Sequence, residues 1–178
     1  MKTWRIDPDH SVAAFTVRHL TVAKVHGQFN TISGMVNYDS ADQAGFSLEA
    51  VIDTAGIYTG INKRDDHLRS PDFFDVTKFP AITFHSTGFA AREDNRGNIT
   101  GQLTVHGITR QVILDAAISG PVKSPEEIGG EMTIGISART MINREDFGIT
   151  WNVPLAGGGV MIGRTIEIFL EIEADLER

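Results

Sequence analysis

The sequence predicts an all-β fold, in which an antiparallel sheet of about eight strands curls into a closed barrel or a sandwich. Segments in which apolar and polar side chains alternate with a period of two recur along the whole chain. Turn signals separate them, and only one segment has a helical pattern. Glycines inside the expected strands, such as Gly34, Gly101, Gly135 and Gly163, favour the barrel, because closure needs sharp bends.

The expected strands follow one another with no linker and no change of composition. In one of them Phe46, Leu48 and Ile52 share a face, and Ser47 and Glu49 lie on the other. We assign the more apolar face of each strand to the interior. The segments with this pattern are 12–19, 25–38, 46–53, 79–85, 99–106, 112–118, 132–138 and 166–173.

One short helix is expected at about residues 60–70, capping or flanking the barrel. Asn62 can cap its start, and Asp65 and Arg69 can pair one turn apart. Ser70-Pro71 ends it, because the residue before proline avoids the helical region. A short polar helix in a β chain is what a lid over a hollow interior would look like.

Composition limits the function classes. The 178 residues fit a single domain over 1–178, and the absence of cysteine excludes disulfides and thiolate metal sites. A net charge of −7 without a basic cluster argues against nucleic acid as a partner. No apolar run approaches the about 20 residues of a membrane helix. No signal peptide precedes the first strand, so we expect a cytoplasmic protein, or a periplasmic one if the sequence is the mature part of a longer chain.

An eight-stranded barrel is wide enough either to fill itself or to hold one slim ligand. The strand pattern alone leaves both interiors open. A solid barrel would suit an interaction or structural module, whereas a hollow one would suit a carrier.

Motifs along nearly the whole chain resemble those of the YceI-like family. The resemblance implies an extended eight-stranded antiparallel β-barrel, lipocalin-like, that holds a polyisoprenoid chain such as a polyprenyl quinone in a long apolar pore. It implies no required cofactor, and it favours the hollow interior. The matching pieces are Trp4-x-Ile6-Asp7-Pro8-x-His10-Ser11, Phe15-x-Val17-x-His19-Leu20, Val25-x-Gly27-x-Phe29, Arg64-Asp65-x-His67-Leu68-Arg69-Ser70-x-Asp72-Phe73-Phe74, Lys78-Phe79-Pro80-x-Ile82-x-Phe84, Gly101-x-Leu103-Thr104-x-His106-Gly107-Ile108-Thr109 and Arg144-x-Asp146-Phe147-Gly148.

A prenyl chain needs an apolar tunnel with polar groups only at its mouth. At the mouth we place Arg64, His67, Phe73 and Phe74. The residues predicted to line the pore are the larger apolar members of the inward faces: Phe15, Val17, Ile32, Val36, Phe46, Leu48, Ile52, Ile82, Phe84, Leu103, Leu114, Ile134, Ile136 and Ile168.

The charged residues of the helical segment have two interpretations. Arg64 and His67 could hydrogen-bond a quinone carbonyl or a phosphate head group. Alternatively, the segment's arginines pair with Asp65, Asp66 or Asp72 and pin the helix to the barrel rim, which is the reading we favour. Arg144 and Asp146 are likewise expected to brace a loop.

Signatures of catalysis and metal binding are weak. None of the six histidines has a metal-type partner at the usual spacing, and we expect His10 and His19 to cap strand ends instead. No nucleophile elbow or phosphate loop is present. The alternative to a binding protein is an enzyme acting on a lipid or quinone through Arg64, Asp65 and His67, with Ser70 a weak candidate nucleophile. Exposed sheet edges favour a homodimer.

Overall fold

The computed structural model describes residues 1–41 and 43–177, and in them β-strands follow one another with a single α-helix, α1 (Asn62–Arg69), after the sixth. The longest strands lie in the second half of the chain. The strands are β1 (Lys2–Ile6), β2 (Val12–His19), β3 (Ala23–Phe29), β4 (Ile32–Tyr38), β5 (Ser47–Asp53), β6 (Ile57–Tyr58), β7 (Ala81–Ala91), β8 (Arg96–Val105), β9 (Ile108–Lys123), β10 (Met132–Asn143) and β11 (Ile162–Leu176).

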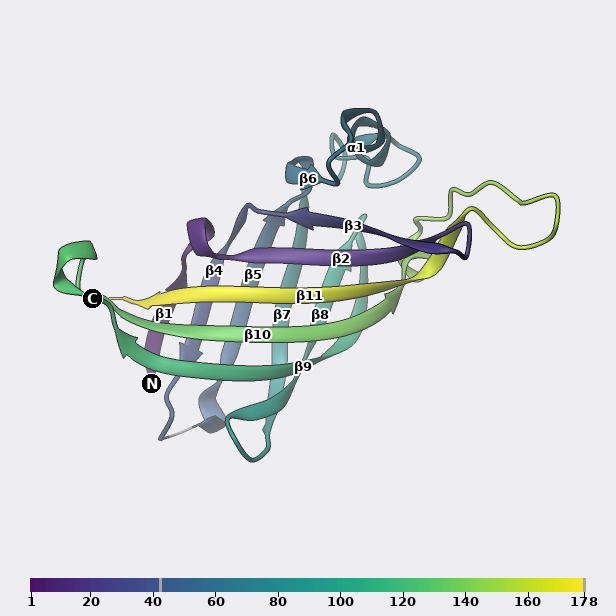
Figure 1. The fold of residues 1–178 in the computed structure, drawn as a ribbon. Coiled ribbons are helices and arrows are strands. Elements are labelled where there is room, and N and C mark those ends of the chain that lie inside the picture. The colour runs from purple at the N-terminus through teal and green to yellow at the C-terminus, as the bar shows by residue number, and fades with distance from the viewer. Residues whose placement is uncertain (42, 178) are drawn as a thin grey trace.

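Eight of these strands close into a barrel, which confirms the predicted fold class. Their order is β1-β4-β5-β7-β8-β9-β10-β11, and β11 pairs back with β1 through Trp4↔Leu176 and Ile6↔Ala174. Every pairing is antiparallel. In Figure 1, β9, β10 and β11 run across the direction of β4, β5, β7 and β8 behind them, as the two sides of a strongly tilted barrel do.

A three-stranded extension, β2-β3-β6, widens the barrel at the helix end. The N-terminal part of β11 pairs with β2, from Ile162↔His19 to Glu171↔Val12, whereas only its last residues pair with β1. The short turn η1 (Pro8–His10) separates β1 from β2 and lets the chain change its place beside β11. Helix α1 lies beyond β6, at the top of Figure 1.

Two strand predictions need correction. Segment 12–19 is not a member of the closed ring, because β1 takes that place, and β1 is too short to show a clear alternation. The expected strand 25–38 is two strands that break at Asn30 and Thr31, because β3 pairs with β2 and β6 whereas β4 pairs with β1 and β5. The expected helix is confirmed, although Asn62 is its first helical residue and Ile61 caps it without a side-chain hydrogen bond.

The end of the barrel away from α1 is solid. Trp4 is 1% exposed and donates from Nε1 to the Tyr38 carbonyl at 3.0 Å. The Phe46 ring packs at 4.7 Å from that of Phe89, and Ile99 is fully buried. Large side chains therefore fill this end, and they supply the core that a barrel with a hollow half needs. Within the described residues, no helix is long and apolar enough to cross a membrane.

Candidate functional site: an apolar cavity at the helix end

The helix end of the barrel encloses a cavity of about 290 Å³. Its wall comes from β2, β3 and the adjoining ends of β4, β5 and β7 to β11, and α1 with the segment after it lies at the mouth. The volume is close to the lower end of the about 300–1,000 Å³ found for small-molecule sites. The barrel is therefore solid at one end and hollow at the other, so each interior expected from the sequence describes one half.

Most of the predicted pore residues lie in this wall, as do all of the predicted mouth residues, Arg64, His67, Phe73 and Phe74. That they bind a ligand stays a prediction. The pore residues found in the wall are Phe15, Val17, Ile32, Leu48, Ile52, Ile82, Phe84, Leu103, Leu114 and Ile168.

Four predicted pore residues are not in the wall: Val36, Phe46, Ile134 and Ile136. They are buried in the solid end, at 0%, 7%, 1% and 1% exposure. Their strands continue past the cavity. The alternation of apolar and polar residues is the same along the hollow and the solid parts of each strand. The pattern identifies the inward face and cannot identify where bulky neighbours such as Trp4 fill the interior.

The segment between β10 and β11 supplies wall residues that the sequence analysis missed. Phe147, Ile149, Trp151 and Met161 line the cavity, and none of them was among the residues predicted to line the pore. The alternation of Phe147, Ile149 and Trp151 with polar residues was the available signal. This loop projects at the right in Figure 1.

Aromatic rings join α1 to that loop at the mouth. The His67 ring lies edge-on to Phe73 and to Trp151, with ring centroids 4.9 and 4.7 Å apart. On the other side, Phe74 makes an edge contact with Phe29 of β3 at 5.5 Å. Edge-to-face contacts of this kind stabilise the pair beyond the area they bury. They hold the helical segment over the cavity without a covalent link.

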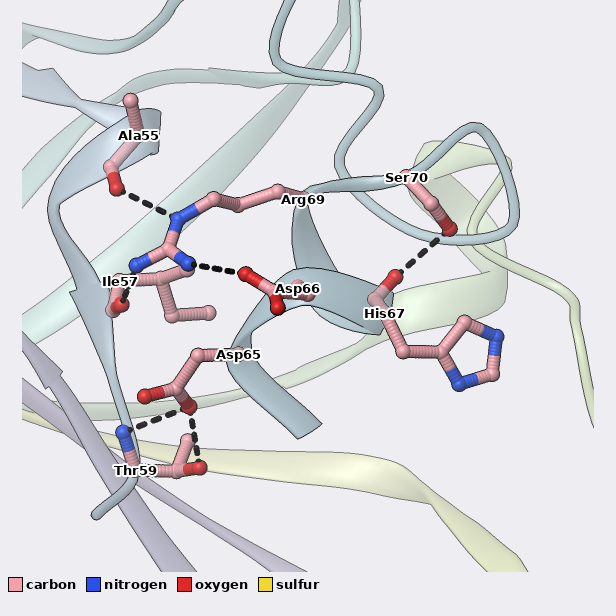
Figure 2. A network of polar contacts seen from close by, with 8 residues as sticks. All are labelled: Ala55, Ile57, Thr59, Asp65, Asp66, His67, Arg69 and Ser70. Carbon is pink, nitrogen blue, oxygen red and sulfur yellow. Dashed lines mark hydrogen bonds and ion pairs between the residues drawn. The ribbon is translucent and has the colours of Figure 1, made fainter. Parts of the chain in front are cut away.

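Polar contacts under α1 fix the helix to the barrel rim, as the structural interpretation expected (Figure 2). Asp65 is 2% exposed, and its carboxylate accepts hydrogen bonds from the amide and the hydroxyl of Thr59. Arg69 donates to the carbonyls of Ala55 and Ile57, both at 2.9 Å, and pairs with Asp66 at 3.2 Å. The expected pairing of Asp65 with Arg69 is wrong, because Asp65 turns inward to Thr59.

The proposed catalytic group is not assembled. Arg64 donates to the hydroxyl and carbonyl of Thr59, and His67 Nε2 lies 2.8 Å from Asp72. The His67 ring points away from the Arg69 side of the helix in Figure 2. Ser70 Oγ donates to the His67 carbonyl instead of facing a base. The side chains of Asp65, His67 and Ser70 therefore each bind a different group.

Arg144 braces a loop, although not through Asp146, which is exposed. Arg144 is 4% exposed, lies in the cavity wall, and donates to the Gly163 carbonyl from Nε and the Ile149 carbonyl from Nη1, at 3.0 and 2.7 Å. Burial lowers the pKa of the Arg144 guanidinium. The group nonetheless stays charged, because an arginine in a protein does not lose its proton.

Of the two histidines expected to cap strand ends, His10 bonds Asp7 at 2.6 Å. Asp7, His10 and Glu173 place their ligand atoms within 4.8 Å of one another, a grouping that the spacing in the sequence could not indicate. It is a surface cluster in which the Asp7–His10 hydrogen bond accounts for the contact. His19 lies in the cavity wall, and within the described part of the chain its ring has no hydrogen bond.

Comparison with known proteins agrees with this architecture. A profile of the YceI-like domain matches residues 4–174. The chain belongs to the YceI-like family. A UPF0312 protein of Staphylococcus aureus is 34% identical over 167 residues, which are 94% of each chain. The Campylobacter jejuni YCEI protein is 31% identical, with a TM-score of 0.74 over 90% of each chain.

More distant structures share the fold of this YceI-like protein. BcnA of Burkholderia cenocepacia has a TM-score of 0.80 at 22% identity, covering 94% of this chain and 98% of BcnA. A polyisoprenoid binding domain from Saccharophagus degradans has a TM-score of 0.73 at 17% identity, covering 99% of this chain and 100% of that one. At these identities the likeness concerns the fold alone.

Proposed function

We propose that this YceI-like protein binds an isoprenoid lipid in its cavity, and carries or stores it without chemical change. The observation that carries the proposal is an apolar cavity beside a solid core. A void lined by isoleucine, leucine and phenylalanine gives up packing contacts that an apolar guest would restore.

The energetics suit a long apolar guest. Burying about 500 Å² of ligand surface contributes on the order of 12 kcal/mol before the cost of association, which is about 4–15 kcal/mol. Contacts of this kind have no preferred direction, so chain length and width are selected more than identity. The polyisoprenoid binding domain of Saccharophagus degradans, which has the same fold, supports the isoprenoid class, of which a polyprenyl quinone is one member.

The test is mass spectrometry of an organic extract from protein purified without detergent. We expect an isoprenoid compound in about equimolar amount with the protein. Ile168→Trp, which places an indole into the cavity, should release much less of it. Phe169→Trp is the matched control, because Phe169 is the neighbouring residue on β11, outside the cavity wall and 41% exposed.

An extract without any lipid, together with no uptake of added polyprenyl quinone by the purified protein, would contradict the proposal. Equal lipid content in the two tryptophan variants would also contradict it, because the ligand would then lie outside the cavity.

A further inference from the structure

The cavity wall has an uneven distribution of charge. Among its described residues are three arginines, Arg18, Arg64 and Arg144, and no aspartate or glutamate. The chain as a whole carries a net charge of −7, so the composition does not account for this excess of positive charge. A wall of this composition favours a guest that is apolar along its length and negative at one end.

The three arginines differ in exposure and in which of their hydrogen-bond donors are already used. Arg18 is exposed at the end of β2, where water solvates it. Arg64 donates from Nε to the hydroxyl and from Nη2 to the carbonyl of Thr59, just before α1. Arg144 is the buried one, and its Nη2 has no hydrogen-bond partner among the described residues.

No carboxylate forms an ion pair with Arg144 within the described residues, although Glu145 lies close enough to act on its charge. Its neighbour Glu145 pairs with the exposed Arg164, 3.2 Å from its Nε. The two bonds that Arg144 makes end on backbone carbonyls, which orient the guanidinium and carry no formal charge. A buried donor on a charged group is costly when it has no acceptor, and it calls for a partner.

We propose that Arg144 anchors the polar end of the ligand, and that the cavity selects chains ending in a phosphate or a carboxylate over chains ending in a neutral alcohol or quinone. An oxygen of such an anion can accept a charge-assisted hydrogen bond from Nη2. The proposal rests on the proposed function, since it names the head group of the lipid held in the same cavity. It differs from the sequence-based expectation, which placed the head group at Arg64 and His67.

The experiment compares chains that differ only in head group, with delipidated full-length protein. The isoprenoid pair is geranylgeranyl monophosphate and geranylgeraniol, and the straight-chain pair is palmitate and hexadecanol. In at least one pair the anion should bind about tenfold or more tightly than the alcohol, the effect of one hydrogen bond to a charged group. A preference in the isoprenoid pair indicates a prenyl phosphate, and one in the straight-chain pair indicates a fatty acid.

Variants assign the preference to Arg144. Arg144→Gln should bring the ratio of dissociation constants close to one while the alcohol binds as before. Arg110→Gln is the matched control, because it removes the same charge at an exposed position outside the cavity wall, and it should leave the ratio unchanged. Arg144→Lys keeps the charge and should retain a smaller preference, and it replaces the glutamine variant if that variant does not fold.

Three results would overturn the inference. One is equal binding of anion and alcohol in both pairs by the unaltered protein, which leaves the proposed function intact. Another is a ratio that Arg144→Gln does not change. The third is an equal loss of both ligands in Arg144→Gln, which would make Arg144 only a brace for the loop. If no chain of either pair binds, the proposed function itself fails, and the two failures are thus distinguishable.

Discussion

Asp65 shows how one side chain can decide the place of a helix. Its carboxylate is buried and accepts two hydrogen bonds from Thr59, whereas the adjacent Asp66 has a side chain that is 77% exposed and pairs with Arg69. The sequence places both on the same short helix and does not distinguish them. The difference comes from the direction each side chain takes toward the rim.

Asp65→Ala should lower the free energy of unfolding by about 1–3 kcal/mol, because the Thr59 amide and hydroxyl lose their acceptor. Asp66→Ala, the matched control, should lower it by less than about 1 kcal/mol, the usual range for an exposed ion pair. Urea denaturation of the two variants checks this. Equal effects would show that the buried contact does not hold the helix.

The Asp7–His10 pair gives stability a pH dependence. The hydrogen bond from His10 lowers the pKa of Asp7 below its usual 3.8, and the Asp7 carboxylate raises the pKa of His10 above its usual 6.5. The stabilisation from His10 is complete below pH 6.5 and is lost as the pH rises through the raised pKa. That from Asp7 is present above pH 3.8 and is lost as the pH falls through the lowered pKa.

A double-mutant cycle of Asp7→Asn and His10→Gln should therefore show its largest coupling between about pH 4 and 6.5. The coupling should shrink toward zero as the pH is raised further. Chemical denaturation at several pH values measures it, and a coupling that is the same at pH 5 and pH 9 would count against the assignment.

At the scale of elements, α1 depends on tertiary contacts. It has eight residues and no side-chain cap, which is too short for stability by itself. Arg69 joins it to the carbonyls of Ala55 and Ile57, and the ring of His67 joins it to Trp151. The helix is therefore a separately anchored lid and not an extension of the barrel.

Arg69→Lys should make the amides of α1 exchange with deuterium about tenfold faster or more, while those of β9 and β10 keep their rates. The loss of a hydrogen bond to a charged donor costs about 1.5–3 kcal/mol, and that cost falls on local opening. Lys63→Gln, at an exposed position of the same helix, is the control and should leave exchange unchanged. If the α1 amides exchange at an unchanged rate in Arg69→Lys, Arg69 does not anchor the helix.

Strands and the helix could be predicted from the sequence where their signals are local. Alternation located the inner strands, and Ser70-Pro71 located the end of the helix, because both signals are local. The break at Asn30 and the membership of β1 in the ring depend on which distant strand each segment meets. No local pattern records that choice.

For the whole molecule, the division into a solid and a hollow end is the main result. Inward faces could be predicted, and most of the predicted lining lies in the cavity wall. The point at which the cavity ends could not be predicted, because Val36 and Ile136 in the solid end follow the same alternating pattern as Ile32 and Leu114 in the wall. The wall formed by the loop around Trp151 was likewise missed, since a loop that folds back leaves only a short apolar signal.

The division into a solid and a hollow end predicts that similar side-chain truncations lower the free energy of unfolding by different amounts. Ile136→Ala in the solid end should lower the free energy of unfolding by about 2–5 kcal/mol, as truncations in dense cores do. Ile168→Ala in the wall should cost clearly less, because the side chain borders empty space and has fewer contacts to lose. Thermal and urea unfolding compare them, and equal costs would mean that the helix end is as well packed as the other.

Native mass spectrometry of delipidated protein with geranylgeraniol and geranylgeranyl monophosphate tests whether the cavity at the helix end holds the lipid chain. Val112→Trp fills the cavity, whereas Ile113→Trp, on the next residue of β9, lies outside the wall at a position that is 54% exposed. We expect one bound chain in the unaltered protein and in Ile113→Trp, and none in Val112→Trp. Undiminished binding by Val112→Trp would contradict this expectation.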